Sequence, residues 1–188
     1  MTAPPRPPGR PRSAQLDADL FASALAIVAE GGYARLTIDG VAARSGVSKA
    51  SIYRRFRSRA DLAAEALLNA YPIAPAATEA APGAVQRHLE RIFAAAGGPA
   101  AEALRGLMAD AQLDAAFHET FRQRFIVSRR EALAAAIRLE HGSHVRELEL
   151  ALDLVFGPMW YRLLVGHAPL DGDLATRLEA LTRQVLLG

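Results

Sequence analysis

The segment Thr37–Phe56, TIDGVAARSGVSKASIYRRF, restricts the fold of this chain more than any other. Apolar residues recur in it at three- and four-residue spacing, which predicts two short helices at about 38–44 and 49–55. A hydroxyl side chain precedes each predicted helix and can cap its first turn, and Gly46 lies in the break between the helices. Two short helices joined by a tight turn that contains glycine form a helix-turn-helix.

Apolar and polar side chains of this motif fall on two different faces. The apolar set that can fix the angle between the helices is Ile38, Val41, Ala42, Val47, Ile52 and Phe56. The residues expected to point away from it are Ser48, Lys49, Ala50, Ser51, Tyr53, Arg54 and Arg55. Small residues allow the second helix to approach the major groove closely, where a tyrosine and cations reach phosphates or bases. The alternative is an ordinary helical hairpin with an arginine-rich surface.

Formal charge is distributed unevenly along the chain. Residues 1–60 hold ten Lys or Arg and four Asp or Glu, a net charge of +6, whereas residues 61–188 hold twelve and sixteen, a net charge of −4. A basic first third favours a polyanionic partner for the N-terminal part, and the motif indicates that this partner is double-stranded DNA. A solvated charged face without a partner is the alternative.

Helical periodicity continues through the rest of the chain and predicts an all-α fold. Residues 1–14, rich in Pro and Arg, are expected to form a flexible basic arm. We expect a helix-turn-helix DNA-binding domain over 15–70 and a larger helical-bundle domain over 71–188. The predicted helices, about nine in total, span roughly 16–31, 38–44, 49–55, 58–69, 83–96, 99–111, 114–140, 145–166 and 172–187.

Other features of the sequence argue against several classes of function. The chain has no cysteine, and therefore no disulfide and no thiolate metal site. No apolar run is long enough to span a membrane and no secretory leader is present, so we expect a cytoplasmic protein. His141 and His144 have a possible metal-ligand spacing but lack a third ligand, and no phosphate-binding loop or nucleophile elbow occurs. We therefore expect neither an enzyme nor a bound metal or cofactor.

The stretch EGGYARLTIDGVAARSGVSKASIYRRFRSRADL, part of a match over about Leu16–Leu67, resembles the DNA-binding domain of the TetR family of transcriptional regulators. The resemblance implies base contacts by Lys49 and Ala50, phosphate contacts by Thr37, Ser51, Tyr53, Arg55 and Arg59, and minor-groove contacts by Arg10 and Arg12. Two positions depart from the family pattern. Arg59 stands where Lys is common, and Gly40 inside the first helix of the motif costs that helix up to about 1 kcal/mol relative to Ala.

The same resemblance implies that the C-terminal domain forms a homodimer and binds a small-molecule effector. Residues 145–166 are apolar on more than one face, which predicts burial on two sides, one of them against a partner subunit. The expected interface residues are Leu152, Phe156, Leu163, Leu164, Leu178, Leu181 and Val185. The expected effector-binding residues, for each of which plain core is the alternative, are Phe93, Leu104, Met108, Phe117, Phe121, Phe125, Met159, Trp160 and Tyr161.

These features predict a regulator that binds a palindromic operator as a homodimer and is released by a small, mostly apolar molecule, and the resemblance to the TetR family implies that it is a repressor. The sequence leaves two alternatives open. One is an activator, or a regulator that no small molecule controls. The other is a helical small-molecule-binding or interaction protein with a vestigial helix-turn-helix.

Overall fold

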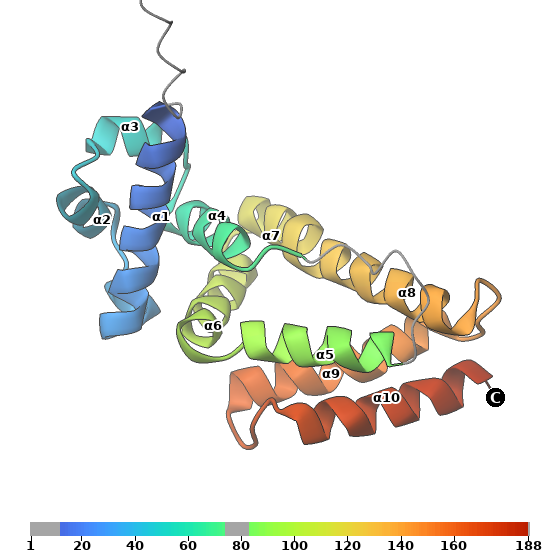
Figure 1. Cartoon of the computed structure of the whole chain (residues 1–188). Coiled ribbons are helices and arrows are strands. Elements are labelled where there is room, and N and C mark those ends of the chain that lie inside the picture. The colour runs from blue at the N-terminus through green and yellow to red at the C-terminus, as the bar shows by residue number, and fades with distance from the viewer. Residues whose placement is uncertain (1–11, 74–82, 188) are drawn as a thin grey trace, which may run out of the picture. The chain divides into compact units, whose positions relative to one another are not determined.

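The computed structural model describes residues 12–73 and 83–187, which fold into two compact units, Met1–Ala70 and Tyr71–Gly188 (Figure 1). The described residues contain helices and no strand, which confirms the predicted all-α fold. No described helix is both long enough and apolar enough to cross a membrane.

The N-terminal unit consists of four α-helices and one turn of 3-10 helix. They are α1 (Arg12–Gly31), η1 (Tyr33–Arg35), α2 (Ile38–Ser45), α3 (Lys49–Tyr53) and α4 (Arg59–Ala70). The start of α1 corrects the predicted extent of the arm, because helix already begins at Arg12. The last proline of the N-terminal segment is Pro11, so no later residue of that segment lacks a backbone N–H.

Hydroxyl side chains cap the three helices that follow η1, and the caps of the first two confirm the prediction. The Thr37 Oγ1 accepts a hydrogen bond from the Gly40 N–H at 3.0 Å, and the Ser48 Oγ accepts one from the Ser51 N–H at 3.3 Å. At the start of α4, the Ser58 Oγ accepts from the Asp61 N–H at 3.1 Å. These bonds satisfy backbone donors that the first helical turn leaves free.

Gly40 itself fits closely beneath the first of these caps. A Cβ at this position would lie 3.1 Å from the Thr37 Oγ1 and 3.6 Å from the Ile27 Cδ1. Any larger residue would therefore crowd the oxygen that accepts the Gly40 N–H, which explains a glycine inside α2 despite its low helix propensity.

Gly46 ends α2 in the left-handed conformation, at φ 72° and ψ 5°. Its N–H donates to the Ala42 carbonyl at 3.0 Å, and a Cβ would meet nothing within 4 Å, so only the backbone angle disfavours other residues. We expect Gly46→Ala to lower the free energy of unfolding by about 1–2 kcal/mol, and Gly46→Asn by less. Urea denaturation of both variants measures this difference, and equal losses for Ala and Asn would contradict it.

The C-terminal unit is built from the remaining helices. They are α5 (Ala84–Ala95), α6 (Gly98–Leu113), α7 (Ala115–Phe121), η2 (Arg122–Val127), α8 (Ser128–His141), α9 (Leu148–Val165) and α10 (Gly172–Leu187). The predicted helix 114–140 is thus an unbroken helical run whose middle, η2, is π-helical, with i→i+5 hydrogen bonds. With this run counted as one, the described residues hold nine α-helices.

Two helix boundaries differ from the prediction for local reasons. The predicted start of α9 at 145 is wrong by three residues, because Glu147 has a positive φ of 47° and the helix begins after it. The predicted end of α3 at 55 is also late. The Arg55 N–H donates to the Ile52 carbonyl at 2.9 Å, an i→i+3 bond that tightens the chain after Tyr53.

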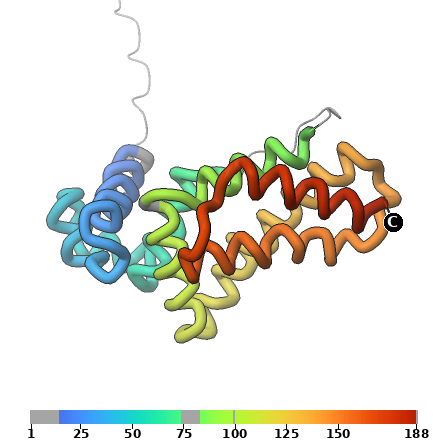
Figure 2. Tube along the Cα trace, turned by 90° about the horizontal axis from the view of Figure 1, so that it is seen from below, coloured from blue at the N-terminus to red at the C-terminus, as the bar shows by residue number. Residues whose placement is uncertain are grey.

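Helices α5, α8, α9 and α10 surround the main core of the C-terminal unit. Figure 2 shows α9 and α10 running side by side and joined by a short turn. Buried side chains from all four helices form one cluster, which includes Leu89, Ile137, Val155 and Leu178. Glu140 at the end of α8 closes the bundle, since its two carboxylate oxygens accept hydrogen bonds from backbone N–H groups at the start of α5, each at 2.8 Å.

His88 on α5 is buried beside the Arg91 guanidinium, whose Nη2 lies 3.3 Å from the ring Nδ1. Burial, with a smaller contribution from the charge of Arg91, lowers the pKa of His88 from 6.5 to about 4. The unfolded chain therefore binds a proton between pH 6.5 and pH 4 that the folded chain does not. The stability that neutral His88 contributes is complete above pH 6.5 and is lost as the pH falls toward 4.

We expect this loss to reach at most about 3 kcal/mol. Thermal unfolding between pH 7 and pH 4.5 should show a shallower loss of stability for His88→Gln than for the unchanged chain. His144→Gln, which alters an exposed histidine, serves as the control and should keep the original slope. Identical slopes for all three proteins would contradict the assignment.

Candidate nucleic-acid interface and relatives

Apolar contacts hold α3 against the rest of the N-terminal unit. Ile52 and Val41 are fully buried, and Phe56 after α3 is buried as well. The Phe56 ring meets the Phe21 ring of α1 edge-on, with 6.0 Å between centroids and 72° between planes. The predicted internal core of the helix-turn-helix is therefore present, except that Ala42 is only half-buried. This core fixes the orientation of α3 within the unit.

The opposite face of α3 is turned to solvent. Ser48, Lys49 and Ala50 are exposed, as are Arg54 and Arg55 just after the helix. Tyr53 has 59% of its surface accessible, a high value for a large aromatic residue. Ser51 is half-buried, and its Oγ accepts a hydrogen bond from the Arg54 Nη2 at 2.8 Å.

Two of the predicted DNA-contacting cations have acidic partners within the unit. The Lys49 Nζ lies 2.7 Å from the Asp39 Oδ2, and both side chains are more than half exposed. Arg55 pairs with Asp17 of α1. An exposed ion pair such as Lys49–Asp39 contributes about 0.2–1 kcal/mol, so a phosphate can replace this carboxylate at little cost.

Arg59 is placed differently from the other predicted cations. It is half-buried, its guanidinium lies 5.1 Å from the centroid of the Tyr33 ring, and its Nη1 donates to the Leu36 carbonyl at 3.4 Å. These contacts give Arg59 a role in packing α4 onto the turn around η1, which the sequence did not indicate. Thr37 is exposed next to this turn, Arg12 begins α1, and Arg10 lies outside the described residues.

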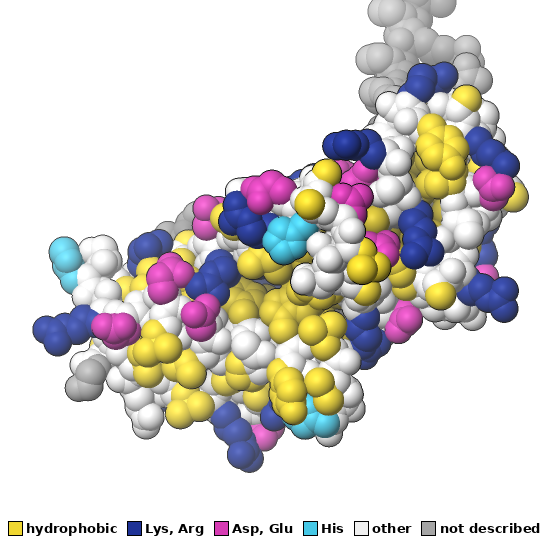
Figure 3. All heavy atoms as spheres, turned by 180° about the vertical axis from the view of Figure 1, so that it is seen from behind, with side chains coloured by type: hydrophobic (Ala, Val, Ile, Leu, Met, Phe, Trp, Pro, Cys, Tyr) yellow, Lys and Arg dark blue, Asp and Glu magenta, His cyan; other side chains and the backbone are white. Residues whose placement is uncertain are grey.

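Basic side chains are spread over the surface of the N-terminal unit, drawn at the right of Figure 3. The exposed Tyr53 and Lys49 of α3, together with Arg54 and Arg55 just after the helix, can contact phosphates and base edges.

In the C-terminal unit, four of the predicted effector-binding residues form an aromatic stack. The Phe121 and Phe125 rings are stacked, with centroids 5.0 Å apart and 16° between planes. Trp160 of α9 meets Phe121 edge-on at 6.3 Å, and Phe117 lies 6.1 Å from Phe121 on the other side. We call Phe117, Phe121, Phe125 and Trp160 the aromatic stack.

The other predicted effector-binding residues do not join this stack. Phe93 and Met159 belong to the four-helix core, and Leu104 is buried in α6. The Met108 Sδ accepts a hydrogen bond from the Gln112 side chain at 3.6 Å. Tyr161 lies apart from the stack, because it is 61% exposed and its ring centroid lies 4.7 Å from that of His167.

A cavity of about 330 Å³ lies elsewhere in the C-terminal unit, between α8 and α9. None of the predicted effector-binding residues lines it, and its wall includes Arg130, Arg138 and Glu149. The sequence did not indicate this cavity, because the residues predicted to bind an effector were aromatic or flexible and apolar, whereas several residues that line the cavity are charged.

The structure also corrects the predicted dimer interface. Leu152, Phe156, Leu163 and Leu178 are buried within the unit itself and are unavailable to a partner. Leu164 and Leu181 are 47% and 48% exposed, and Val185 is half-buried. Five of the exposed or half-buried residues of α9 fall instead on one stripe at alternating spacings of four and three. We call this set, Leu150, Leu154, Gly157, Tyr161 and Leu164, the outer stripe.

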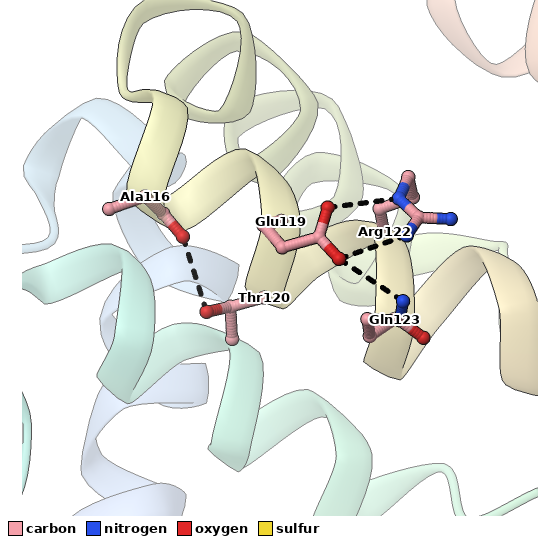
Figure 4. A network of polar contacts seen from close by, with 5 residues as sticks. All are labelled: Ala116, Glu119, Thr120, Arg122 and Gln123. Atoms are coloured by element: carbon pink, nitrogen blue, oxygen red, sulfur yellow. Dashed lines mark hydrogen bonds and ion pairs between the residues drawn. The ribbon is translucent and has the colours of Figure 1, made fainter.

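Glu119 and Arg122 form an exposed ion pair on α7 and η2. The Glu119 carboxylate accepts two hydrogen bonds from Arg122, at 2.9 and 3.0 Å, and one from Gln123, at 3.1 Å (Figure 4). The Arg122 hydrogen bonds lower the pKa of Glu119 to about 2, with a smaller effect from Gln123. The cluster belongs to the surface of the unit.

His141 lies near two carboxylates. Ligand atoms of Glu140, His141 and Glu179 lie within 4.8 Å of one another. Both Glu140 oxygens already accept the backbone hydrogen bonds that cap α5. The cluster is therefore accounted for by helix capping.

Known proteins resemble this chain along most of its length. The family model described as bacterial regulatory proteins, tetR family, matches residues 20–66, and the model described as tetracyclin repressor-like, C-terminal domain, matches residues 75–182. The HTH-type transcriptional regulator YdeS of Bacillus subtilis (strain 168) is 30% identical over 174 residues, which are 84% of this chain and 82% of that protein.

Solved structures share the fold. A structure described as the TetR family transcription regulator SCO0332 superposes with a TM-score of 0.71 and 24% identity, covering 90% of this chain and 97% of that one. The structure of the transcriptional regulator FadR from Bacillus subtilis in complex with stearoyl-CoA superposes with a TM-score of 0.64. Its sequence is 13% identical, and the match covers 89% of this chain and 98% of that one. The two family models and the relative in Bacillus together show that the chain belongs to the TetR family of bacterial transcriptional regulators.

Proposed function

We propose that this regulator is a cytoplasmic repressor that binds a palindromic operator as a homodimer and leaves it when a small, mostly apolar molecule binds. The observation that supports DNA binding most directly is the outward face of α3. There Tyr53 is 59% exposed, Lys49 and Arg55 flank it, and a buried apolar core holds the helix in place. In a helix-turn-helix, the second helix lies in the major groove in this way.

The outer stripe of α9 supports the homodimer. A single subunit leaves Leu164 of this stripe half exposed, and Leu181 of the neighbouring α10 likewise. Gly157 lies at the centre of the stripe, where a Cβ would meet nothing within 4 Å, so a second helix can approach closely there. A two-fold pair built on this face presents two copies of α3, as a palindrome requires.

A relative's ligand supports the effector. FadR from Bacillus subtilis was solved with stearoyl-CoA, a long apolar chain on a polar head, and it shares the fold of this chain. An effector that binds better to a conformer with a different spacing of the two α3 helices shifts the population toward that conformer and releases DNA.

DNA binding through this face is tested by its salt dependence. Fluorescence anisotropy with labelled duplex DNA should show that log K falls linearly and steeply as log salt rises, because each phosphate contact releases counterions. We expect a slope of at least about 4, corresponding to two or more phosphate contacts from each of two subunits. An affinity that does not change with salt would contradict the proposal and favour the helical interaction protein with a vestigial motif.

A further inference from the structure

Arg129, in the first turn of α8, is half-buried, and one nitrogen of its guanidinium group is buried without a hydrogen-bond partner. This Nη1 has less than 1 Å² of accessible surface and no hydrogen-bond partner among the residues that the structure describes. The neighbouring Arg130, by contrast, forms ion pairs with two carboxylates. The Arg130 Nη1 and Nη2 lie 2.6 Å and 2.7 Å from the carboxylates of Asp153 and Glu149. Buried polar groups are almost always hydrogen-bonded, so the Arg129 Nη1 requires an explanation.

The surroundings of Arg129 are aromatic. Its guanidinium carbon lies 4.7 Å from the centroid of the Phe125 ring, and the aromatic stack continues from there through Phe121 to Trp160. Phe117, Phe121, Phe125 and Arg129 follow one another at four-residue spacing along α7, η2 and the start of α8. A cation thus ends a row of apolar rings. The π-helical segment η2, a type of distortion that is frequent at functional sites, lies in the middle of this row.

The packing against Phe125 does not replace a hydrogen-bond acceptor. A ring face attracts a cation but accepts none of the in-plane N–H bonds of a guanidinium. Burial lowers the pKa of Arg129 below its usual value, as expected for a cation that has lost water without gaining an anion. A carboxylate is the group whose geometry suits a guanidinium best, since its two oxygens match two N–H donors.

We propose that Arg129 is the anion-binding residue of the effector site, and that the effector is an amphipathic carboxylic acid whose apolar body lies against the aromatic stack. The inference deepens the proposed function, since it rests on the existence of a small-molecule effector. Phe121 and Phe125 are buried in the structure, so the effector has to separate rings that now touch. Trp160, at the end of the stack, then changes its surroundings.

The test uses Trp160 as a reporter, because it is the only tryptophan of the chain. Its fluorescence is measured in the full-length protein during titration with decanoate and 4-phenylbutanoate. Decan-1-ol and 4-phenylbutan-1-ol, which lack the charge, are the matched ligands. We expect at least one acid to bind about ten- to a hundredfold more tightly than its alcohol, a ratio typical of a charged hydrogen bond.

Arg129→Met should reduce this preference for the acid to less than about threefold, and Arg129→Lys should leave an intermediate preference. Arg130→Met is the matched control on the same helix and should leave the preference unchanged. The melting temperature of Arg129→Met without ligand should equal or exceed that of the unchanged chain, because the variant removes an unpaired buried cation. A purely structural arginine would instead lower it. If Arg129→Met does not fold, the preference for the acid is compared between Arg129→Lys and Arg130→Met. The proposal then requires a reduced preference in Arg129→Lys and an unchanged preference in Arg130→Met.

Three outcomes would overturn the proposal. The first is that neither acid binds, and the second is that Arg129→Met still prefers the acid over the alcohol. The third is that only Arg130→Met loses this preference, which would place the anion in the cavity between α8 and α9. The test does not involve DNA. If the protein binds the acids through Arg129 but does not bind DNA, the proposed function is wrong and this inference stands. If it binds DNA but does not bind the acids through Arg129, this inference alone is wrong.

Discussion

A chain carrying both Tyr53→Ala and Lys49→Ala is expected to lose at least about a hundredfold in affinity for its operator. Each lost base or phosphate contact costs about 1–3 kcal/mol, and a two-fold dimer loses both contacts twice. Fold and dimer should survive, because Tyr53 is 59% exposed and the Lys49–Asp39 pair lies at the surface. Fluorescence anisotropy at fixed salt measures the affinity, and circular dichroism and light scattering verify helix content and dimer.

The control for this double variant is Arg146→Ala, which removes an exposed cation from the C-terminal unit. It should change operator affinity by less than about twofold, since a distant exposed charge contributes little. The account fails if the double variant binds the operator as well as the unchanged chain does. It also fails if Arg146→Ala weakens binding equally, because general charge rather than α3 would then be responsible.

The second large effect is expected at the dimer face. Leu164→Glu combined with Leu181→Glu should convert the dimer into a monomer at micromolar concentration. The two substitutions place four carboxylates in an apolar interface of a symmetric pair, and an unpaired buried charge is costly. Both side chains are about half exposed in a single subunit, so the fold of the subunit should persist. Sedimentation equilibrium measures the mass, and operator affinity should fall by at least about a hundredfold with it.

Leu113→Glu provides the matched control, because Leu113 is 87% exposed at the end of α6, outside the outer stripe. This variant should remain dimeric and bind the operator normally. A dimer that withstands the double glutamate substitution would show that α9 and α10 do not form the interface. Dissociation by Leu113→Glu would point to a different face.

The N-terminal unit could be predicted closely because its signals are local. A hydroxyl before each helix, as at Thr37 and Ser48, and glycine where φ is positive, as at Gly46, depend on a few neighbouring residues. The alternation of buried and exposed positions around Ile52 follows from helical periodicity alone. The predicted start of α1, at about residue 16, is late because regular apolar spacing begins only at Leu16, whereas the last proline of the N-terminal segment is Pro11.

The C-terminal unit was less predictable because its helices are apolar on several faces. Periodicity cannot distinguish which side of α9 meets α5, α8 and α10, so Leu152 and Phe156 were expected at the dimer face although they lie in the core. Arg129 was missed as well. Its neighbour Arg130 has the same side chain, and only tertiary contacts show that one guanidinium is paired and the other is not.

The central claim is that two copies of α3 read one DNA duplex, and the selection of bound sequences from random DNA by the purified protein tests it most directly. The account predicts that the recovered sequences share an inverted repeat whose half-sites are about 10–10.5 base pairs apart, or a multiple of this spacing. It also predicts that the Tyr53→Ala, Lys49→Ala variant recovers no such repeat. Sequences without any common repeat, or the same repeat recovered by the variant, would contradict it.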